Sequence, residues 1–192
     1  MYFRYLLGIF AFSALLLVSG AEAQSKLDSG DIVESLQKLE TVPTGVTAAL
    51  LRKQASDSIR ARPGPALNRP PLSDELNSLA QFTVEINFDF ASAVIRPDSY
   101  RTVGRIADAL HHPQLLGYRF LIIGHTDAKG GREANLKLSQ LRADAILEAL
   151  TTSFNVPARR LSAVGLGEEQ LRDPAHPEAA TNRRVQLVNI GN

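Results

Sequence analysis

Two patterns of hydrophobic spacing alternate between residues 80 and 192, and this order most limits the folds open to the chain. Residues 82–88 carry apolar side chains at every second position, which is typical of a half-buried strand. Residues 97–110 begin with proline and then place apolar side chains three and four positions apart, which predicts a helix with one apolar stripe. A continuous apolar run at 120–123 indicates a central strand that is covered on both faces.

The remaining patterns in this segment add one helix and two strands. A second helix is predicted from residue 136 or 138 to residue 150. Four of its side chains are expected to face inward: Leu138, Leu141, Ala145 and Ile146. Apolar stretches at 161–164 and 185–190 predict two further strands. The order strand-helix-strand-helix-strand-strand predicts an α+β two-layer sandwich, in which a mixed four-stranded sheet carries both helices on one face.

The first 23 residues have the order of a secretory signal peptide. Arg4 supplies a positive charge near the start, residues 6–18 are uncharged and mostly apolar, and small residues follow up to Ala23. The apolar stretch is shorter than the ~20 residues that span a bilayer as a helix. We therefore expect export with cleavage after Ala23, and the alternative is an uncleaved anchor helix.

Residues 24–79 are interpreted as a flexible, proline-containing arm ahead of a folded domain at 80–192. Four of the ten prolines lie between residues 63 and 71, and a stretch so short of backbone donors favours an extended linker. Marginal helices are predicted at 31–39 and 47–58. A solvated tether is the favoured interpretation of the arm. The alternative is that one of its helices docks onto an envelope protein.

The composition excludes several functions. The chain has 21 Lys and Arg residues against 20 Asp and Glu residues, so we expect no nucleic-acid binding through bulk positive charge. Because cysteine is absent, the chain has neither disulfides nor thiolate metal sites, nor a cysteine that could carry a lipid. The four histidines lack metal-ligand spacing, and no nucleophile motif or phosphate-binding glycine loop occurs. We therefore expect no metal, no cofactor and no enzymatic activity.

One segment, GHTDAKG at residues 124–130, carries the candidate site. Its Asp127 follows the predicted buried strand, and Arg142 lies within the next predicted helix. A carboxylate and a guanidinium that face one small space suit a zwitterionic ligand, because the first can take an ammonium and the second a carboxylate. From the spacing alone two other interpretations stay open: the two residues pair with each other, or Asp127 caps the helix.

Several short motifs follow one another over roughly residues 80–190, which is nearly the whole predicted domain. They are Asn87-Phe88-Asp89-Phe90 with Ala93, the 124–130 segment, Asn135-x-x-Leu138-Ser139-x-x-Arg142-Ala143, Arg160-Leu161, Gly165-Leu166-Gly167-Glu168 and Asn182-Arg183-Arg184-Val185. In this order and spacing they resemble the OmpA-like C-terminal, peptidoglycan-binding domain family. Such a set is far more specific than a single short pattern.

The resemblance implies non-covalent binding of peptidoglycan through the meso-diaminopimelate residue of its stem peptide, which would anchor an exported protein to the cell wall. Asp127 would take the ammonium of that residue's free end and Arg142 its carboxylate. The other groove positions implied are Asp89, Thr126, Asn135 and Leu138, with Arg183 and Arg184 as supporting residues. The implied location is the periplasm, or the periplasmic face of the outer membrane, of a Gram-negative-type cell.

Two features depart from the family's pattern, and the sequence also bears on three other functions. Ala134 stands where an aromatic residue is commoner, and the absence of cysteine excludes a lipidated relative. Residues 24–77 are too few for eight barrel strands of ~9–11 residues each, so we expect no outer-membrane barrel there. An inner-membrane-anchored, stator-like or envelope-spanning protein would need residues 6–18 as an uncleaved span. A cell-wall hydrolase is the weakest alternative, because paired carboxylates, zinc ligands and a nucleophile–base pair are missing.

Overall fold

The computed structural model describes residues 28–37, 45–61 and 74–192. Its longer helices and its strands are α1 (Ser29–Gln37), α2 (Ala48–Ala61), α3 (Asp74–Ser78), α4 (Tyr100–Leu110), α5 (Arg132–Glu148), β1 (Gln81–Val84), β2 (Phe120–His125), β3 (Leu161–Gly167) and β4 (Val185–Asn189). A short 3-10 turn at Pro97–Ser99 leads into α4, as expected for a proline that starts a helix.

The four strands form one mixed sheet in the order β1-β4-β2-β3. The β1–β4 and β4–β2 pairs are antiparallel, and β2–β3 is parallel. This arrangement confirms the predicted α+β fold with its mixed four-stranded sheet. All six residues of β2 are buried, as the continuous apolar run predicts for a central strand.

The first strand is shorter than its alternating pattern predicts. The expected strand at 82–88 ends at Val84, because that residue lies opposite Val185, where β4 begins. Beyond this point β4 offers no partner, and Phe88 instead forms an isolated bridge with Ile95. The 85–95 segment therefore leaves the sheet and forms a turn beside α5.

Helix α5 approaches the sheet more closely than a stripe of leucines would allow. Leu141 is 49% exposed, so the prediction that it faces inward is wrong, whereas Ile146 is fully buried as predicted. A Cβ placed on Gly124 would lie 2.4 Å from the Ser139 carbonyl oxygen, and one on Gly165 would lie 2.2 Å from the Gln140 nitrogen. Small side chains must therefore fill this contact, and Leu141 lies on the outward side of the helix.

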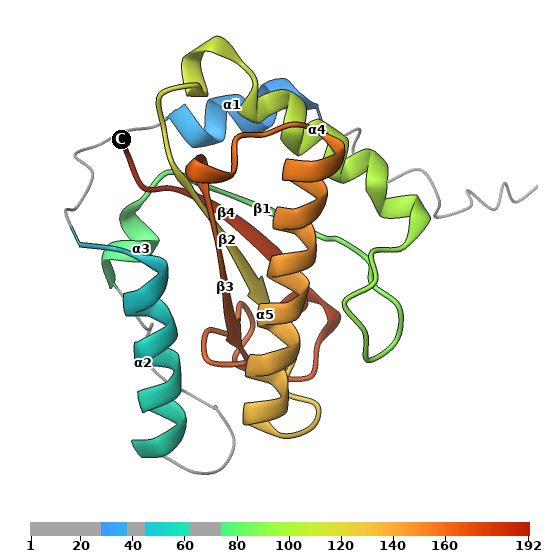
Figure 1. The fold of residues 1–192 in the computed structure, drawn as a ribbon. Coiled ribbons are helices and arrows are strands. Elements are labelled where there is room, and N and C mark those ends of the chain that lie inside the picture. The colour runs from blue at the N-terminus through green and yellow to red at the C-terminus, as the bar shows by residue number, and fades with distance from the viewer. Residues whose placement is uncertain (1–27, 38–44, 62–73) are drawn as a thin grey trace, which may run out of the picture.

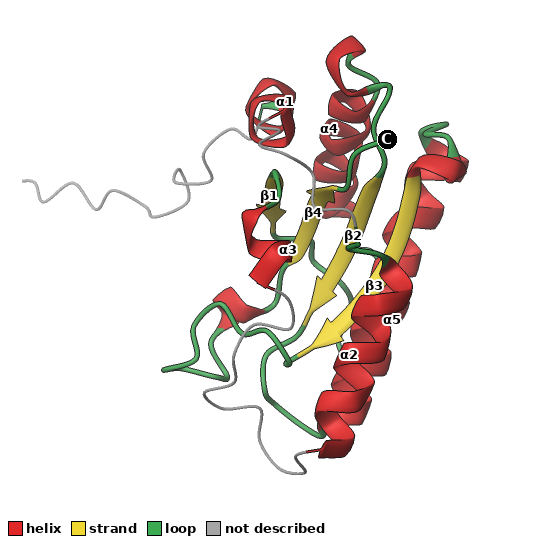
Figure 2. Ribbon diagram, turned by 90° about the vertical axis from the view of Figure 1, so that its left-hand side faces the viewer, coloured by secondary structure: helices red, strands yellow, loops and turns green. Residues whose placement is uncertain are grey.

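Helices cover both faces of the sheet, which differs from the predicted two-layer arrangement (Figure 1). Helices α4 and α5 lie against one face, together with the buried apolar residues of α1. Residues of α2 and α3 cover the other face, where Leu51 and Leu76 pack with Leu121, Ile123 and Val164. Figure 2 shows the same sheet turned by 90°.

This packing contradicts the interpretation of residues 24–79 as a flexible arm with marginal helices at 31–39 and 47–58, in the part of that range that the structure describes. The physical reason is that β2 is apolar on both faces, so the second face needs a cover that the chain itself provides. A docking helix for a partner would need the same side chains, such as Ile32 and Leu51, which are fully buried within this chain.

Other predictions for the N-terminal part lie outside the described residues. These are the signal peptide at 1–23 and the proline-rich stretch at 63–71. Among the described helices, none is both long enough and apolar enough to cross a membrane.

Candidate functional site

Asp127 lies at the end of the central strand, where the chain turns into the loop before α5. The loop is fixed on both sides of this residue: the Thr126 amide donates to Gly167 at 3.0 Å, and the Ala128 amide donates to Pro177 at 2.9 Å. The Asp127 side chain is only 10% exposed. One of its oxygens, Oδ1, accepts a hydrogen bond from the Lys129 amide at 3.3 Å. The carboxylate is therefore held in place and is largely buried.

Asn135 holds this loop from the first turn of α5. Its side-chain Nδ2 lies 3.2 Å from the Asp127 carbonyl oxygen, 3.1 Å from that of Lys129 and 2.6 Å from Oε2 of Glu168. The predicted groove residue Asn135 is only 6% exposed. It thus positions the Asp127 loop, and the motif residue Glu168 is part of the same network.

The start of α5 is fixed by a buried ion pair. Arg132 and Glu169 form two contacts, of 2.7 Å from Nε and 2.5 Å from Nη2, and both side chains are almost fully buried. Ser58 of α2 donates to the same carboxylate at 2.6 Å. Such a two-contact geometry is typical of strong arginine–carboxylate pairs. Helix α2 thereby joins the support of the candidate site.

Arg142 lies farther along α5 and is half-buried. Its Nε donates to the Ser92 carbonyl oxygen at 3.0 Å, and its guanidinium lies 4.9 Å from the centre of the Phe88 ring. Burial lowers the pKa of Arg142 from its ordinary value, nearby Arg183 lowers it further, and Asp127 acts in the opposite direction. The two groups that this side chain contacts, a carbonyl oxygen and an aromatic ring, are both uncharged.

Asp127 forms its ion pair with Arg183 and not with Arg142, the partner that the sequence spacing left open. Arg183 donates from Nη1 to Asp127 Oδ2 at 2.7 Å, and its side chain is 47% exposed. The resemblance implies Arg183 and Arg184 only as supporting residues. In the structure they have different partners, because Arg183 contacts Asp127 and Arg184 does not. Arg184 donates to the carbonyl oxygens of Asn182 and Gln170, and burial lowers its pKa to about 10.

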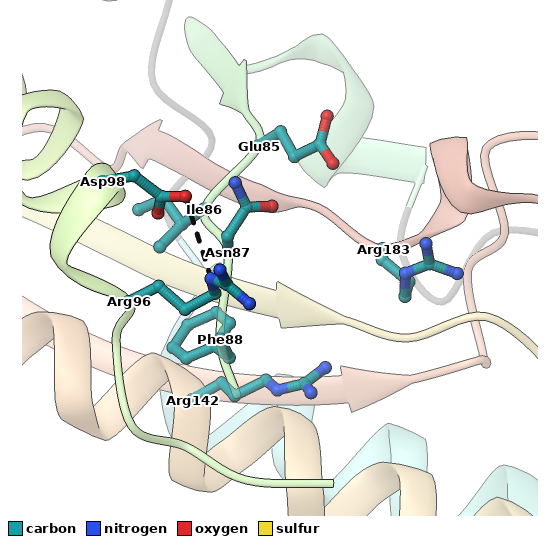
Figure 3. A pocket seen from close by; sticks show the side chains of 8 residues that line it. All are labelled: Glu85, Ile86, Asn87, Phe88, Arg96, Asp98, Arg142 and Arg183. Atoms are coloured by element: carbon teal, nitrogen blue, oxygen red, sulfur yellow. Dashed lines mark ion pairs between the residues drawn. The ribbon is translucent and has the colours of Figure 1, made fainter. Parts of the chain in front are cut away.

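A cavity of about 420 Å³ brings the two arginines of the candidate site together (Figure 3). Arg142 enters it from α5 and Arg183 from the segment just before β4. The ring of Phe88, on the 85–88 segment, lies against the Arg142 guanidinium. Arg96 Nε lies 3.7 Å from Asp98 Oδ2. The cavity is thus lined by three arginines and by the carboxylates of Glu85 and Asp98, and Asp127 is joined to it by its ion pair with Arg183.

The structure brings the other predicted site residues together only in part. Leu138 is half-buried one helical turn before Arg142. Thr126 is 3% exposed, and within the described residues its hydroxyl has no hydrogen-bond partner. Asp89 is exposed in the turn that also contains Ser92, where its amide donates to the Val94 carbonyl oxygen at 3.0 Å. Phe88 and Ser92 are the contacts that sequence reasoning missed.

His125 immediately precedes this site and is buried in the neutral form. Its Nε2 lies 2.9 Å from Oε1 of Gln186 on β4. Burial holds the pKa of His125 well below its usual range, and the positive charge of Arg184 lowers it further. The unfolded chain therefore binds a proton near pH 6.5 that the folded chain does not bind. The resulting stability is present above about pH 6.5 and is lost as the pH falls below it.

We expect the free energy of unfolding to decrease more steeply in the wild type than in His125→Gln between pH 6.5 and pH 5. The difference should reach at most about 1.4 kcal/mol per pH unit, which is the effect of one proton. Urea denaturation at several pH values measures both slopes. Equal slopes in the two proteins would contradict a neutral buried His125.

In the described part of the chain, no group of three or more His, Cys, Asp or Glu side chains is placed to hold a metal ion. The candidate site itself consists of charged side chains, the Asp127 carboxylate and the guanidinium groups of Arg142 and Arg183. One carboxylate and two guanidinium groups suit a ligand that carries both an ammonium and a carboxylate.

Comparison with known proteins gives a consistent result. The family model described as OmpA family matches residues 87–184, which is half of the chain. The peptidoglycan-associated lipoprotein of Brucella melitensis is 38% identical over 123 residues, which cover 59% of this chain and 70% of that protein. Outer membrane porin F of Pseudomonas fluorescens is 37% identical over 105 residues, which cover 54% of this chain.

The match to porin F covers only part of that protein, 31% of its length. Among solved structures, a MotB-like protein from Desulfovibrio vulgaris is similar in fold, with a TM-score of 0.50 at 19% identity. That similarity covers 85% of this chain and 96% of the other. It therefore extends beyond the part that the family model matches.

Proposed function

This chain belongs to the OmpA family, and on that basis we propose that it binds peptidoglycan non-covalently and anchors an exported protein to the cell wall. The name of the Brucella relative, a peptidoglycan-associated lipoprotein, supports this ligand. The proposed role is binding without catalysis. The proposed location is the periplasm or the periplasmic face of the outer membrane, which agrees with relatives named as outer-membrane proteins.

The observation that carries the proposal is that one carboxylate and two guanidinium groups lie close together, with Arg183 in contact with Asp127. Asp127 is held on a rigid loop, and Arg142 and Arg183 line the neighbouring cavity. The free end of meso-diaminopimelate carries an ammonium and a carboxylate on one carbon. We propose that Asp127 takes the ammonium and Arg142 the carboxylate, because a planar guanidinium matches the two oxygens of a carboxylate.

The remaining proposed residues act around this pair. Asn135 fixes the loop that carries Asp127, through its contacts to two carbonyl oxygens. Leu138 and Thr126 would form the neighbouring wall, and Asp89 would lie at the rim. Phe88 and the Ser92 carbonyl hold Arg142 in one orientation, so less freedom is lost when a ligand binds.

Sedimentation with purified sacculi tests the function directly. We expect the chain without residues 1–23 to sediment with sacculi that contain meso-diaminopimelate, and free meso-diaminopimelate to release it. Nα-acetyl-lysinamide at the same concentration is the control, because it keeps the side-chain ammonium and has no carboxylate. A protein that stays in the supernatant, or that both compounds release equally, would contradict the proposal.

A further inference from the structure

The carboxylate that is to receive the ligand's ammonium already has a cationic partner in this structure. Arg183 donates to Asp127 Oδ2 at 2.7 Å, and the Asp127 side chain is only 10% exposed. An incoming ammonium therefore meets a carboxylate whose charge is largely neutralised. To bind there it has to replace or share the Arg183 contact.

Replacing that contact affects the second arginine of the site. Arg142 and Arg183 line the same cavity (Figure 3). The charge of Arg183 is close enough to lower the pKa of Arg142, and the charge of Asp127 partly offsets this. If an ammonium takes Asp127, this offset is lost for the guanidinium groups of Arg142 and Arg183. The carboxylates that line the cavity itself are Glu85 and Asp98, and Asp98 pairs with Arg96. Like charges in a partly buried space repel each other.

We propose that Arg183 is a specificity-determining residue, which makes binding of an ammonium at Asp127 conditional on a carboxylate in the same ligand. A zwitterionic end supplies that carboxylate, and both guanidinium groups can share it. An ammonium alone leaves them unmatched. Specificity then arises from the repulsion imposed on the wrong ligand as well as from attraction to the right one.

This inference rests on the proposed function and deepens it from a binding site to a selective one. It predicts rejection of stem peptides that carry lysine in place of diaminopimelate. The two peptides differ by a single carboxylate, and its absence leaves Arg142 and Arg183 without the group that both could share. The discrimination therefore depends on Arg183 and on its charge.

Calorimetric titration of the chain without residues 1–23 with two synthetic tripeptides tests the inference. One tripeptide ends in meso-diaminopimelate and the other in lysine, and they are otherwise identical. In Arg183→Gln we expect weaker binding of the first peptide and equal or tighter binding of the second. The ratio of the two affinities should fall about tenfold from its wild-type value.

Three matched variants isolate the role of the Arg183 charge. Arg183→Lys keeps a cation that can pair with Asp127 and should retain most of the discrimination. Arg96→Gln removes a positive charge from the same cavity without touching Asp127, and it should leave the ratio unchanged. Arg184→Gln removes the adjacent arginine, which donates to the backbone carbonyls of Asn182 and Gln170. It should lower the melting temperature and leave the ratio unchanged.

The possible results separate the two levels of the argument. Equal loss of affinity for both peptides in Arg183→Gln, or no change for either, would overturn the inference and leave the proposed function standing. A wild type that fails to bind the diaminopimelate peptide, or binds both peptides equally, would overturn the proposed function and the inference with it. Thermal melts of each variant show whether lost binding reflects lost folding.

Discussion

Replacing Gly165 with alanine should lower the free energy of unfolding by about 3 kcal/mol or more, at the upper end of the range for overpacked cores. The added Cβ would lie 2.2 Å from the Gln140 nitrogen and 2.6 Å from Ser139 Oγ. The first of these is backbone of α5, which cannot rotate away as a side chain can. The helix would therefore have to move from the sheet.

This displacement would also break the bonds that hold α5 to the outer side of β3. The Gly165 amide donates to the Gln140 side chain at 2.9 Å, and the Gly167 amide donates to Ser139 Oγ at 2.8 Å. Since α5 carries Arg142, we expect binding to suffer together with stability. Urea denaturation measures the stability effect directly.

Gly117→Ala is the matched control, because a Cβ there meets nothing closer than 4.0 Å. It should change the free energy of unfolding by no more than about 0.5 kcal/mol. If Gly165→Ala were as stable as this control, the close contact between α5 and β3 would be wrong.

The sheet and its helices could be predicted from the sequence because their signals are local. Alternation at 82–84, the buried run at 120–123 and the helical spacing at 100–110 each arise from neighbours within a few residues. The inward face of α5 could not be predicted in this way. Small residues of α5 face the sheet because Gly124 and Gly165 on two strands let the helix come close. Apolar content alone therefore predicts the wrong side for Leu141.

The packing of α2 and α3 was accessible to a stricter physical argument. A strand that is apolar on both faces requires cover on both faces, and two helices on one face supply only half of it. The second cover had to come from residues before 80, where Leu51 and Leu76 indeed lie against the sheet. The patterns there predict helices at 31–39 and 47–58 but do not show which surface these helices cover.

The candidate site was predictable as a set of residues more than as an arrangement. Short motifs identified Asp127 and Arg142, yet spacing could not show that Asp127 pairs with Arg183, 56 residues away. The contact between Arg142 and the Ser92 carbonyl could not be predicted either, because that carbonyl is a backbone group. Backbone acceptors leave no trace in residue identity.

Asp127→Ala and Arg142→Ala should each weaken binding of the diaminopimelate peptide by ~2–5 kcal/mol, because each change leaves one end of the ligand without its counter-charge. Arg142→Lys should also bind weakly, since an ammonium cannot reproduce the two parallel contacts of a guanidinium. Calorimetric titration measures these affinities, and thermal melts of the same variants accompany it.

The melts distinguish binding from a merely structural role of the same charges. Arg183 is 47% exposed, so its pairing with Asp127 should contribute little to folding, within the ~0–1 kcal/mol of surface ion pairs. Asp127→Ala should therefore lose binding while its melting temperature changes by only a few degrees. Loss of stability and binding in proportion would assign Asp127 to the fold. Among the described residues, Asp127 is the carboxylate that pairs with Arg183. Unchanged sacculus binding by Asp127→Ala would therefore exclude this pair from the site.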